Sequence, residues 1–123
     1  MDSSAWLEYF ADGPNAAFFA APVEKGRELL VPTIVIFEVY KRLQVQRDER
    51  TAARGVAMLR QGRVMTLTTE LAIAAAAVST TTRLPMADSI ILATARAENA
   101  VIWTQDSDFA DFERVQFRAH RKA

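Results

Sequence analysis

Apolar and polar positions along this chain follow two periods, one typical of strands and one typical of helices. Short runs rich in β-branched residues predict strands at 64–67 and 101–104, with a third at 115–117. The longer segments 70–82 and 87–98 predict helices. Because predicted strands and helices alternate, the pattern favours an α/β domain with a mostly parallel sheet.

One apolar stretch, 29–37, has enough β-branched residues to form a single long strand, but Pro32 interrupts it. Proline suits the first turn of a helix and removes a hydrogen-bond donor from a central strand. Beyond the proline, apolar positions recur at helical spacing, namely Ile36, Val39, Tyr40 and Leu43. We therefore expect a strand at about 28–31 and a helix at about 33–47.

The rest of the chain predicts one compact unit. The segment 50–61 has helical spacing despite Gly55, which costs roughly 1 kcal/mol in a helix. Residues 11–17 predict a turn in which Asn15 caps the helix that follows. No internal repeat or linker is visible, and a length of 123 residues predicts a single domain, 1–123.

The composition is that of an ordinary globular protein, with 50% apolar and 24% charged residues. The absence of cysteine excludes disulfides, a thiolate zinc site and a cysteine nucleophile, and together with a start unlike a signal peptide it favours the cytoplasm. The longest uncharged run, 71–82, is shorter than the roughly 20 apolar residues of a membrane span. We expect no membrane insertion.

The charges narrow the chemistry. Basic and acidic residues are equal in number, 15 each, so a nucleic-acid partner has to be attracted by local patches. The chain has one histidine, His120, which excludes mechanisms that need two histidines and leaves no buried Ser-His-Asp triad. Carboxylates are the most plentiful reactive groups.

Three acids occur at the ends of predicted elements, one after Pro85 and two after the strand predicted at 101–104. Asp88 falls in the first turn of an almost wholly apolar helix, where it either meets the helix dipole or takes part in a site. Asp106 and Asp108 come directly after the strand, where open parallel sheets bind ligands, although Asp108 also suits a turn.

Two further acids lie earlier in the chain. Glu38 stands among apolar neighbours on the helix predicted at 33–47, so a solvated helix face does not explain it well. Asp2 precedes an amphipathic helix in an Asp-Ser-Ser sequence, and helix capping alone accounts for it. If these acids converge at the carboxyl edge of the sheet, their mutual repulsion requires cations, and carboxylate oxygens suit Mg²⁺ or Mn²⁺ acting on a phosphodiester.

Three pieces of the chain resemble a known family: "DSSAWLEYF", "LLVPTIVIFEVYKRL" and "LPMADSIILATARAENAVIWTQDSDF". In their order and content they are similar to PIN-domain ribonucleases, specifically the VapC toxins of bacterial and archaeal toxin–antitoxin pairs. The most specific piece is the third, in which a proline and an aspartate precede an Ala-rich helix, a strand and "T-x-D-x-D-F".

The resemblance implies a three-layer α/β/α sandwich on a mostly parallel sheet of four or five strands. It implies an endoribonuclease that uses Mg²⁺ or Mn²⁺ to hydrolyse RNA to a 5′-phosphate and a 3′-hydroxyl. Carried over by position, the catalytic and metal-binding acids are Asp2, Glu38, Asp88 and Asp106, with Asp108 as an additional metal ligand and with Ser4 and Thr104 as hydroxyls that orient the acids.

The resemblance also implies partners. These are a structured RNA substrate such as tRNA or ribosomal RNA, a VapB-like antitoxin whose tail blocks the site, and a second copy in a homodimer. The sequence departs from the family in one respect, because only Met1 precedes Asp2 where the family has an apolar strand. The start therefore looks clipped, which weakens the expected anchoring of Asp2.

Some alternatives stay open at this stage. Arg47, Arg50 and Arg54 share a predicted helix face, and four basic residues crowd the tail at 118–122, so either group forms an RNA-binding patch or a solvated surface. A non-catalytic PIN-like module that binds RNA or an antitoxin is the main functional alternative. An aspartyl-nucleophile phosphatase would instead need its D-x-D pair after the first strand, whereas "QDSDF" is near the C-terminus.

Overall fold

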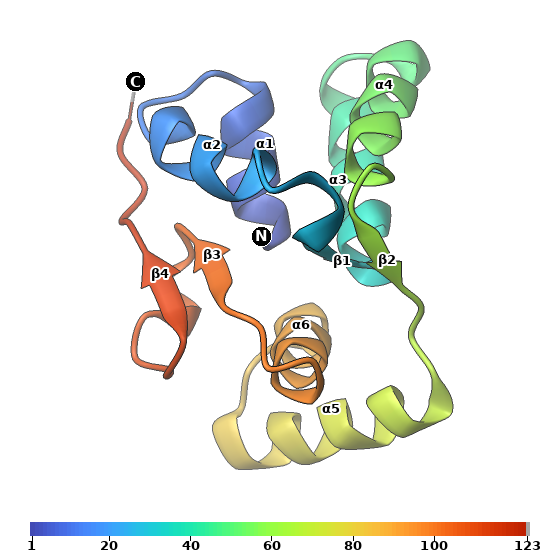
Figure 1. Cartoon of the computed structure of the whole chain (residues 1–123), viewed down its shortest axis with the longest axis vertical. Helices are drawn as coiled ribbons and strands as arrows, with labels where there is room; N and C mark the ends of the chain where they lie inside the picture. The colour runs from blue at the N-terminus through green and yellow to red at the C-terminus, as the bar shows by residue number, and fades with distance from the viewer. Residues whose placement is uncertain (123) are drawn as a thin grey trace.

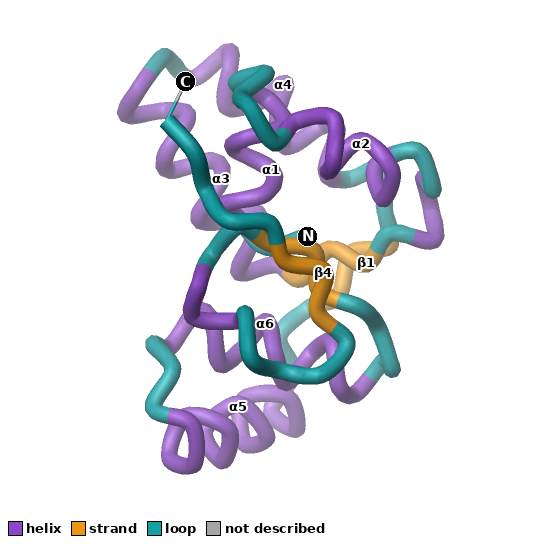
Figure 2. Tube along the Cα trace, turned by 90° about the vertical axis from the view of Figure 1, so that its left-hand side faces the viewer, coloured by secondary structure: helices purple, strands orange, loops and turns teal. Residues whose placement is uncertain are grey.

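The computed structural model describes residues 1–122. In chain order the elements are α1 (Ser3–Phe10), α2 (Ala16–Val23), η1 (Gly26–Glu28), β1 (Leu30–Pro32), α3 (Thr33–Gln46), α4 (Glu49–Leu59), β2 (Arg63–Met65), α5 (Thr69–Thr82), α6 (Met86–Ala97), β3 (Ile102–Thr104), η2 (Ser107–Phe109) and β4 (Val115–Phe117). The strands form a thin middle layer, with α1 to α4 on one side and α5 and α6 on the other (Figures 1 and 2).

The strands pair in parallel, as the alternating pattern predicts. β1 pairs with β2, with Leu30 opposite Arg63, and β3 pairs with β4, with Ile102 opposite Val115. Two helices, α3 and α4, lie between the strands of the first pair in sequence, so this connection is the crossover that parallel strands require. The α/β class and the parallel pairing are therefore confirmed.

The prediction of one continuous sheet of four or five strands is wrong for the described residues. Their four strands form two separate pairs, because β1 and β3 make no backbone hydrogen bonds to each other. The start of the chain lies beside β3, where the Asp2 amide donates to the Trp103 carbonyl at 3.2 Å. A cavity of about 210 Å³ borders both β1 and β3 and is lined by Met1, Leu30, Ile91 and Ile102 among others.

The core explains why α6 carries almost no polar residues. Every residue from Ser89 to Ala95 is buried, because α6 packs between α5 and the strands. The buried hydroxyls of Ser89 and Thr94 donate to the backbone carbonyls of Leu84 and Ile90, so their burial leaves no unpaired donor. The helix is therefore a rigid support for the acid in its first turn.

Most predicted elements agree with the structure to within two residues. The division at Pro32 is confirmed, since β1 ends at Pro32 and α3 begins at Thr33. The expected capping role of Asn15 is wrong, because its side chain makes no cap hydrogen bond. The side-chain amide of Asn15 donates instead to the Gln105 side chain and the Ala119 carbonyl. This connects the α1–α2 turn to the C-terminal segment.

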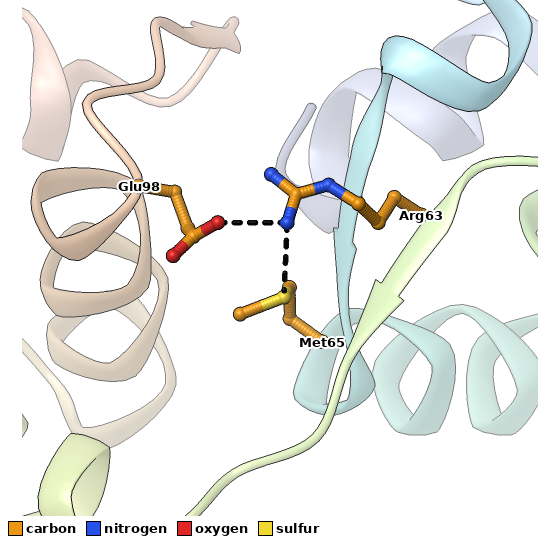
Figure 3. Close-up of polar contacts among 3 residues, drawn as sticks. All are labelled: Arg63, Met65 and Glu98. Carbon is orange, nitrogen blue, oxygen red and sulfur yellow. Dashed lines mark hydrogen bonds and ion pairs between the residues drawn. The ribbon is translucent and has the colours of Figure 1, made fainter.

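One ion pair connects the middle layer to α6. The guanidinium of Arg63 on β2 donates to Glu98 at 2.7 Å and also contacts the Met65 sulfur at 3.6 Å (Figure 3).

Within the described residues, no helix combines the length and apolarity of a membrane span.

Candidate metal centre

Three aspartates from two parts of the chain meet at one point. Asp88 stands in the first turn of α6, and Asp106 and Asp108 follow the end of β3. One carboxylate oxygen from each lies within 4.8 Å of the others. Asp88 and Asp106 are partly buried and Asp108 is exposed, so the cluster is open to solvent on one side.

Asp2 is held in place by four hydrogen bonds from three residues. Its carboxylate accepts from the Ser4 hydroxyl at 2.9 and 3.0 Å, from the Ala5 amide at 3.0 Å and from the Thr104 hydroxyl at 2.7 Å. Burial raises the pKa of the Asp2 carboxyl, and these hydrogen bonds act in the opposite direction. Asp2 therefore caps α1, as the simpler interpretation of the sequence holds, and its charge also acts on Asp88.

The Thr104 hydroxyl connects two of the acids. It donates to Asp2 and accepts from the Asp106 amide at 2.8 Å, while the Asp106 carboxylate accepts from the Asp108 amide at 2.9 Å. Thr104 itself is fully buried at the end of β3. The predicted orienting positions of Ser4 and Thr104 thus coincide with direct hydrogen bonds to an acid.

Glu38 approaches from α3. Its carboxylate accepts a short hydrogen bond from the Ser3 hydroxyl on α1, which fixes the glutamate across the α1–α3 contact. Glu38 and Asp2 lie outside the group of three close carboxylates. The negative charges of Asp2 and Glu38 still act on this group, because both raise the pKa of Asp88.

The electrostatics of Asp88 reflect all of these acids. Burial, followed by the negative charges of Asp106, Asp2, Asp108 and Glu38, raises the pKa of Asp88 to about 7. A carboxyl group whose pKa is raised by burial together with specific charged neighbours is a candidate functional residue. The five predicted acids therefore share one electrostatic environment.

The donor set fits a divalent cation. The close atoms are all carboxylate oxygens, which Mg²⁺ and Mn²⁺ prefer, and the cluster contains no thiolate or imidazole of the kind that zinc favours. A bound cation would remove the repulsion that raises the pKa of Asp88. Asp88, Asp106 and Asp108 are the residues placed to hold it, with Asp2 and Glu38 close enough to add charge.

Comparison with known proteins identifies the domain. The family model described as "PIN domain" matches residues 1–115. This chain belongs to the PIN-domain family. Among solved structures, a "Toxin-antitoxin complex from Klebsiella pneumoniae" is similar with a TM-score of 0.76 and 23% identity, over 94% of this chain and 92% of that one. No curated protein sequence matches significantly.

Ser3 is the residue of this PIN domain that sequence reasoning missed. The family resemblance implies Ser4 alone as an orienting hydroxyl, yet both serines bond to acids, Ser4 to Asp2 and Ser3 to Glu38. The contact between Ser3 and Glu38 joins residues 35 positions apart and exists only once α1 packs on α3. The adjacent hydroxyls in "DSSAW" were the available signal.

The predicted basic patches of the PIN domain have different surroundings. Arg47 and Arg54 line a separate cavity between α1, α3 and α4, together with Phe10 and Met58. The Arg118 guanidinium lies 4.3 Å from the centre of the Phe18 ring, so this cation is already engaged. His120 borders the groove that begins at Asp106.

Proposed function

We propose that this PIN domain is a metal-dependent endoribonuclease toxin of the VapC type. Four acids, from the start of α1, from α3 and from the end of β3, act on Asp88 in α6, and this convergence is the observation on which the proposal rests. PIN domains are generally nucleases, and the acidic cluster matches the ligands that phosphodiester hydrolysis with Mg²⁺ or Mn²⁺ requires.

The chain's own residues hold the acids in place for this chemistry. Thr104 and Ser4 orient Asp2, Ser3 orients Glu38, and the buried helix α6 supports Asp88. A divalent ion supplies Lewis acidity toward a phosphate oxygen and lowers the pKa of bound water. Hydrolysis then adds water across the P–O3′ bond and yields a 5′-phosphate and a 3′-hydroxyl.

We further propose that the toxin acts in the cytoplasm as a homodimer and is inhibited by a VapB-like antitoxin. The structural similarity to a toxin–antitoxin complex supports an antitoxin partner. A structured RNA such as tRNA or ribosomal RNA is the expected substrate class. The charge-neutral chain would recognise it through local contacts beside the acids.

The test is cleavage of labelled tRNA and ribosomal RNA with Mn²⁺ by the wild type and by Asp88→Asn and Asp106→Asn. Removal of one ligand and its charge should lower cleavage at least about 100-fold, an effect typical of metal-site changes. Asp111→Asn is the matched control, because Asp111 is an exposed aspartate after η2 outside the cluster, and it should retain full activity.

Two results would contradict the proposed nuclease activity. Folded Asp88→Asn protein that cuts as fast as the wild type removes this acid from catalysis. A wild-type protein that binds RNA or antitoxin but shows neither cleavage nor any response to a chelator is the non-catalytic module.

A further inference from the structure

A cavity of about 420 Å³ lies where η1, the end of α4 and the start of β2 meet. It shares no residue with the acidic cluster and is lined by Arg27, Arg60, Gln61, Gly62 and Arg63. Three of these residues are arginines, and none of them is an acid. The cavity therefore gathers positive charge from three separate elements, and the nuclease chemistry uses none of it.

The cavity stands at the opposite end of β1 from the candidate metal centre. Arg27 lies on η1, which precedes β1, and Arg63 is the first residue of β2. The amino ends of these parallel strands lie side by side, with Leu30 opposite Arg63. Glu38 is carried by α3, which begins at the carboxyl end of β1. A ligand in the cavity is therefore held by a different set of side chains from a cation at the acids.

Ordinary structural roles account for only part of this positive charge. Arg60 is the C-cap of α4, where a cation suits the negative end of the helix dipole. Arg63 donates to Glu98 and contacts Met65 through Nη1 (Figure 3). Among residues 1–122 its Nη2 and Nε atoms have no hydrogen-bond partner, and neither Arg27 nor Arg60 forms an ion pair. Most of the guanidinium donors at the cavity thus remain available to a ligand.

Three guanidiniums around one cavity match an oxyanion with more than one negative charge. Each guanidinium donates in a planar fork that fits two oxygens of a phosphate group. A terminal phosphate carries about two negative charges at neutral pH. An internal phosphate of a nucleic-acid strand carries only one. The convergence of three cations therefore favours a terminal phosphate or a pyrophosphate group.

We propose that this cavity binds the terminal phosphate or pyrophosphate group of a small molecule, held by Arg27, Arg60 and Arg63. Gln61 and Gly62 complete the lining. Arg63 binds the ligand through Nη2 and Nε, so its ion pair with Glu98 is retained. The site does not depend on the proposed nuclease activity, because the two share no residue.

Isothermal titration calorimetry with pyrophosphate and with inorganic phosphate tests the site. The protein is metal-free and a chelator is present, so neither anion can bind through a cation at the acidic cluster. Sodium chloride keeps the ionic strength equal in all titrations. Pyrophosphate should bind saturably to one site, and more tightly than inorganic phosphate. Arg27→Gln and Arg60→Gln should each weaken pyrophosphate binding about tenfold, the effect of removing a hydrogen bond to a charged group.

Arg50→Gln is the matched control. Arg50 is an exposed arginine in the first turn of α4, outside the cavity, so this variant should bind pyrophosphate like the wild type. All three substitutions alter exposed side chains, and circular dichroism checks that each variant is folded.

Three results would overturn the proposal. The first is that pyrophosphate shows no saturable binding at millimolar concentrations. The second is that the Arg27 and Arg60 variants bind as well as the Arg50 control. The third is that a single-stranded RNA without terminal phosphates displaces pyrophosphate, because these arginines then contact a nucleic-acid backbone and not a small molecule.

Discussion

Asp88 changes its charge near neutral pH because it is partly buried and because four other acids lie near enough to act on it. Its pKa of about 7 arises from burial first and from the charges of Asp106, Asp2, Asp108 and Glu38 after that. In the metal-free protein, ionisation of this group opposes folding, whereas in an unfolded chain the same side chain ionises near 3.8. The residue that makes the site useful for cation binding is therefore a source of instability without a cation.

This gives a prediction about stability and pH. The metal-free protein should lose stability as the pH rises from about 4 to about 7, because the unfolded chain releases the Asp88 proton first. Asp88→Asn removes this loss and should stabilise the chelator-treated protein at pH 8 by on the order of 1–2 kcal/mol, a value reduced for screening by solvent. Thermal unfolding at several pH values measures the effect.

The comparison at low pH is the internal control. Below about pH 4 the two proteins should be nearly equal, since Asp88 is protonated in both the folded and the unfolded wild type. Asp111→Asn should follow the wild type throughout. Parallel curves for the wild type and Asp88→Asn across the whole pH range would show that folding does not raise the pKa of Asp88.

At the level of elements, residue types and their spacing along the chain predicted where most helices and strands begin and end. Proline geometry and apolar spacing placed the change from β1 to α3 correctly, and the short segment Val115–Phe117, with apolar residues at alternate positions, predicted β4 with its observed bounds. The role of Asn15 was wrong because its partners, Gln105 and Ala119, are about a hundred residues away. The split of the sheet was missed for the same reason, since pairing depends on which strands meet in space.

The candidate site likewise contains residues that the sequence could identify and one that only the folded structure reveals. The acids were identifiable because a carboxylate in an apolar helix or directly after a strand is unusual by itself. The hydroxyl of Ser3 was not, because its bond to Glu38 depends on the packing of α1 against α3. Whether these acids bind metal stays a prediction, for which the structure supplies proximity and shared electrostatics.

The passage from α4 to β2 offers a test of how closely these elements pack. A methyl group on Gly62 would lie 2.5 Å from the Leu29 carbonyl oxygen and 2.8 Å from the Val31 side chain. The Arg63 amide bonds to that same carbonyl at 2.8 Å, next to the β1–β2 pair, so the backbone has little freedom to move away. The close approach explains why this position is glycine.

Gly62→Ala should therefore destabilise the protein by about 1–3 kcal/mol, the usual cost of overpacking. Chemical denaturation measures the free energy of unfolding. Gln61→Ala is the matched control, because Gln61 is exposed and adjacent, and it should change stability by less than about 0.5 kcal/mol. A Gly62→Ala protein as stable as the control would mean that β1 and the α4–β2 turn pack less tightly than the structure indicates.

For the whole molecule, the balance of charge conceals a strong local separation. Equal numbers of acidic and basic residues give no net charge, yet four acids act on Asp88 while Lys41 and Arg42 lie exposed on α3. Long-range attraction of a polyanion is weak under these conditions. The acidic cluster by itself repels a phosphodiester. A bound divalent cation should therefore be needed both for binding of a phosphodiester at the cluster and for its hydrolysis.

Cation binding should be visible as a gain in the stability of the entire fold. A ligand that binds only the folded state at 100 times its dissociation constant stabilises it by about 2.7 kcal/mol, which raises the Tm of a domain of this size by several degrees. Mn²⁺ should have this effect on the wild type and on Asp111→Asn, and should lose most of it with Asp106→Asn. The effect should weaken as the pH falls below about 7, because the cation then has to displace the Asp88 proton. Potassium at the same ionic strength separates specific binding from screening: if it stabilises the protein as much as Mn²⁺ does, the acids attract ions only diffusely and the cluster is no metal centre.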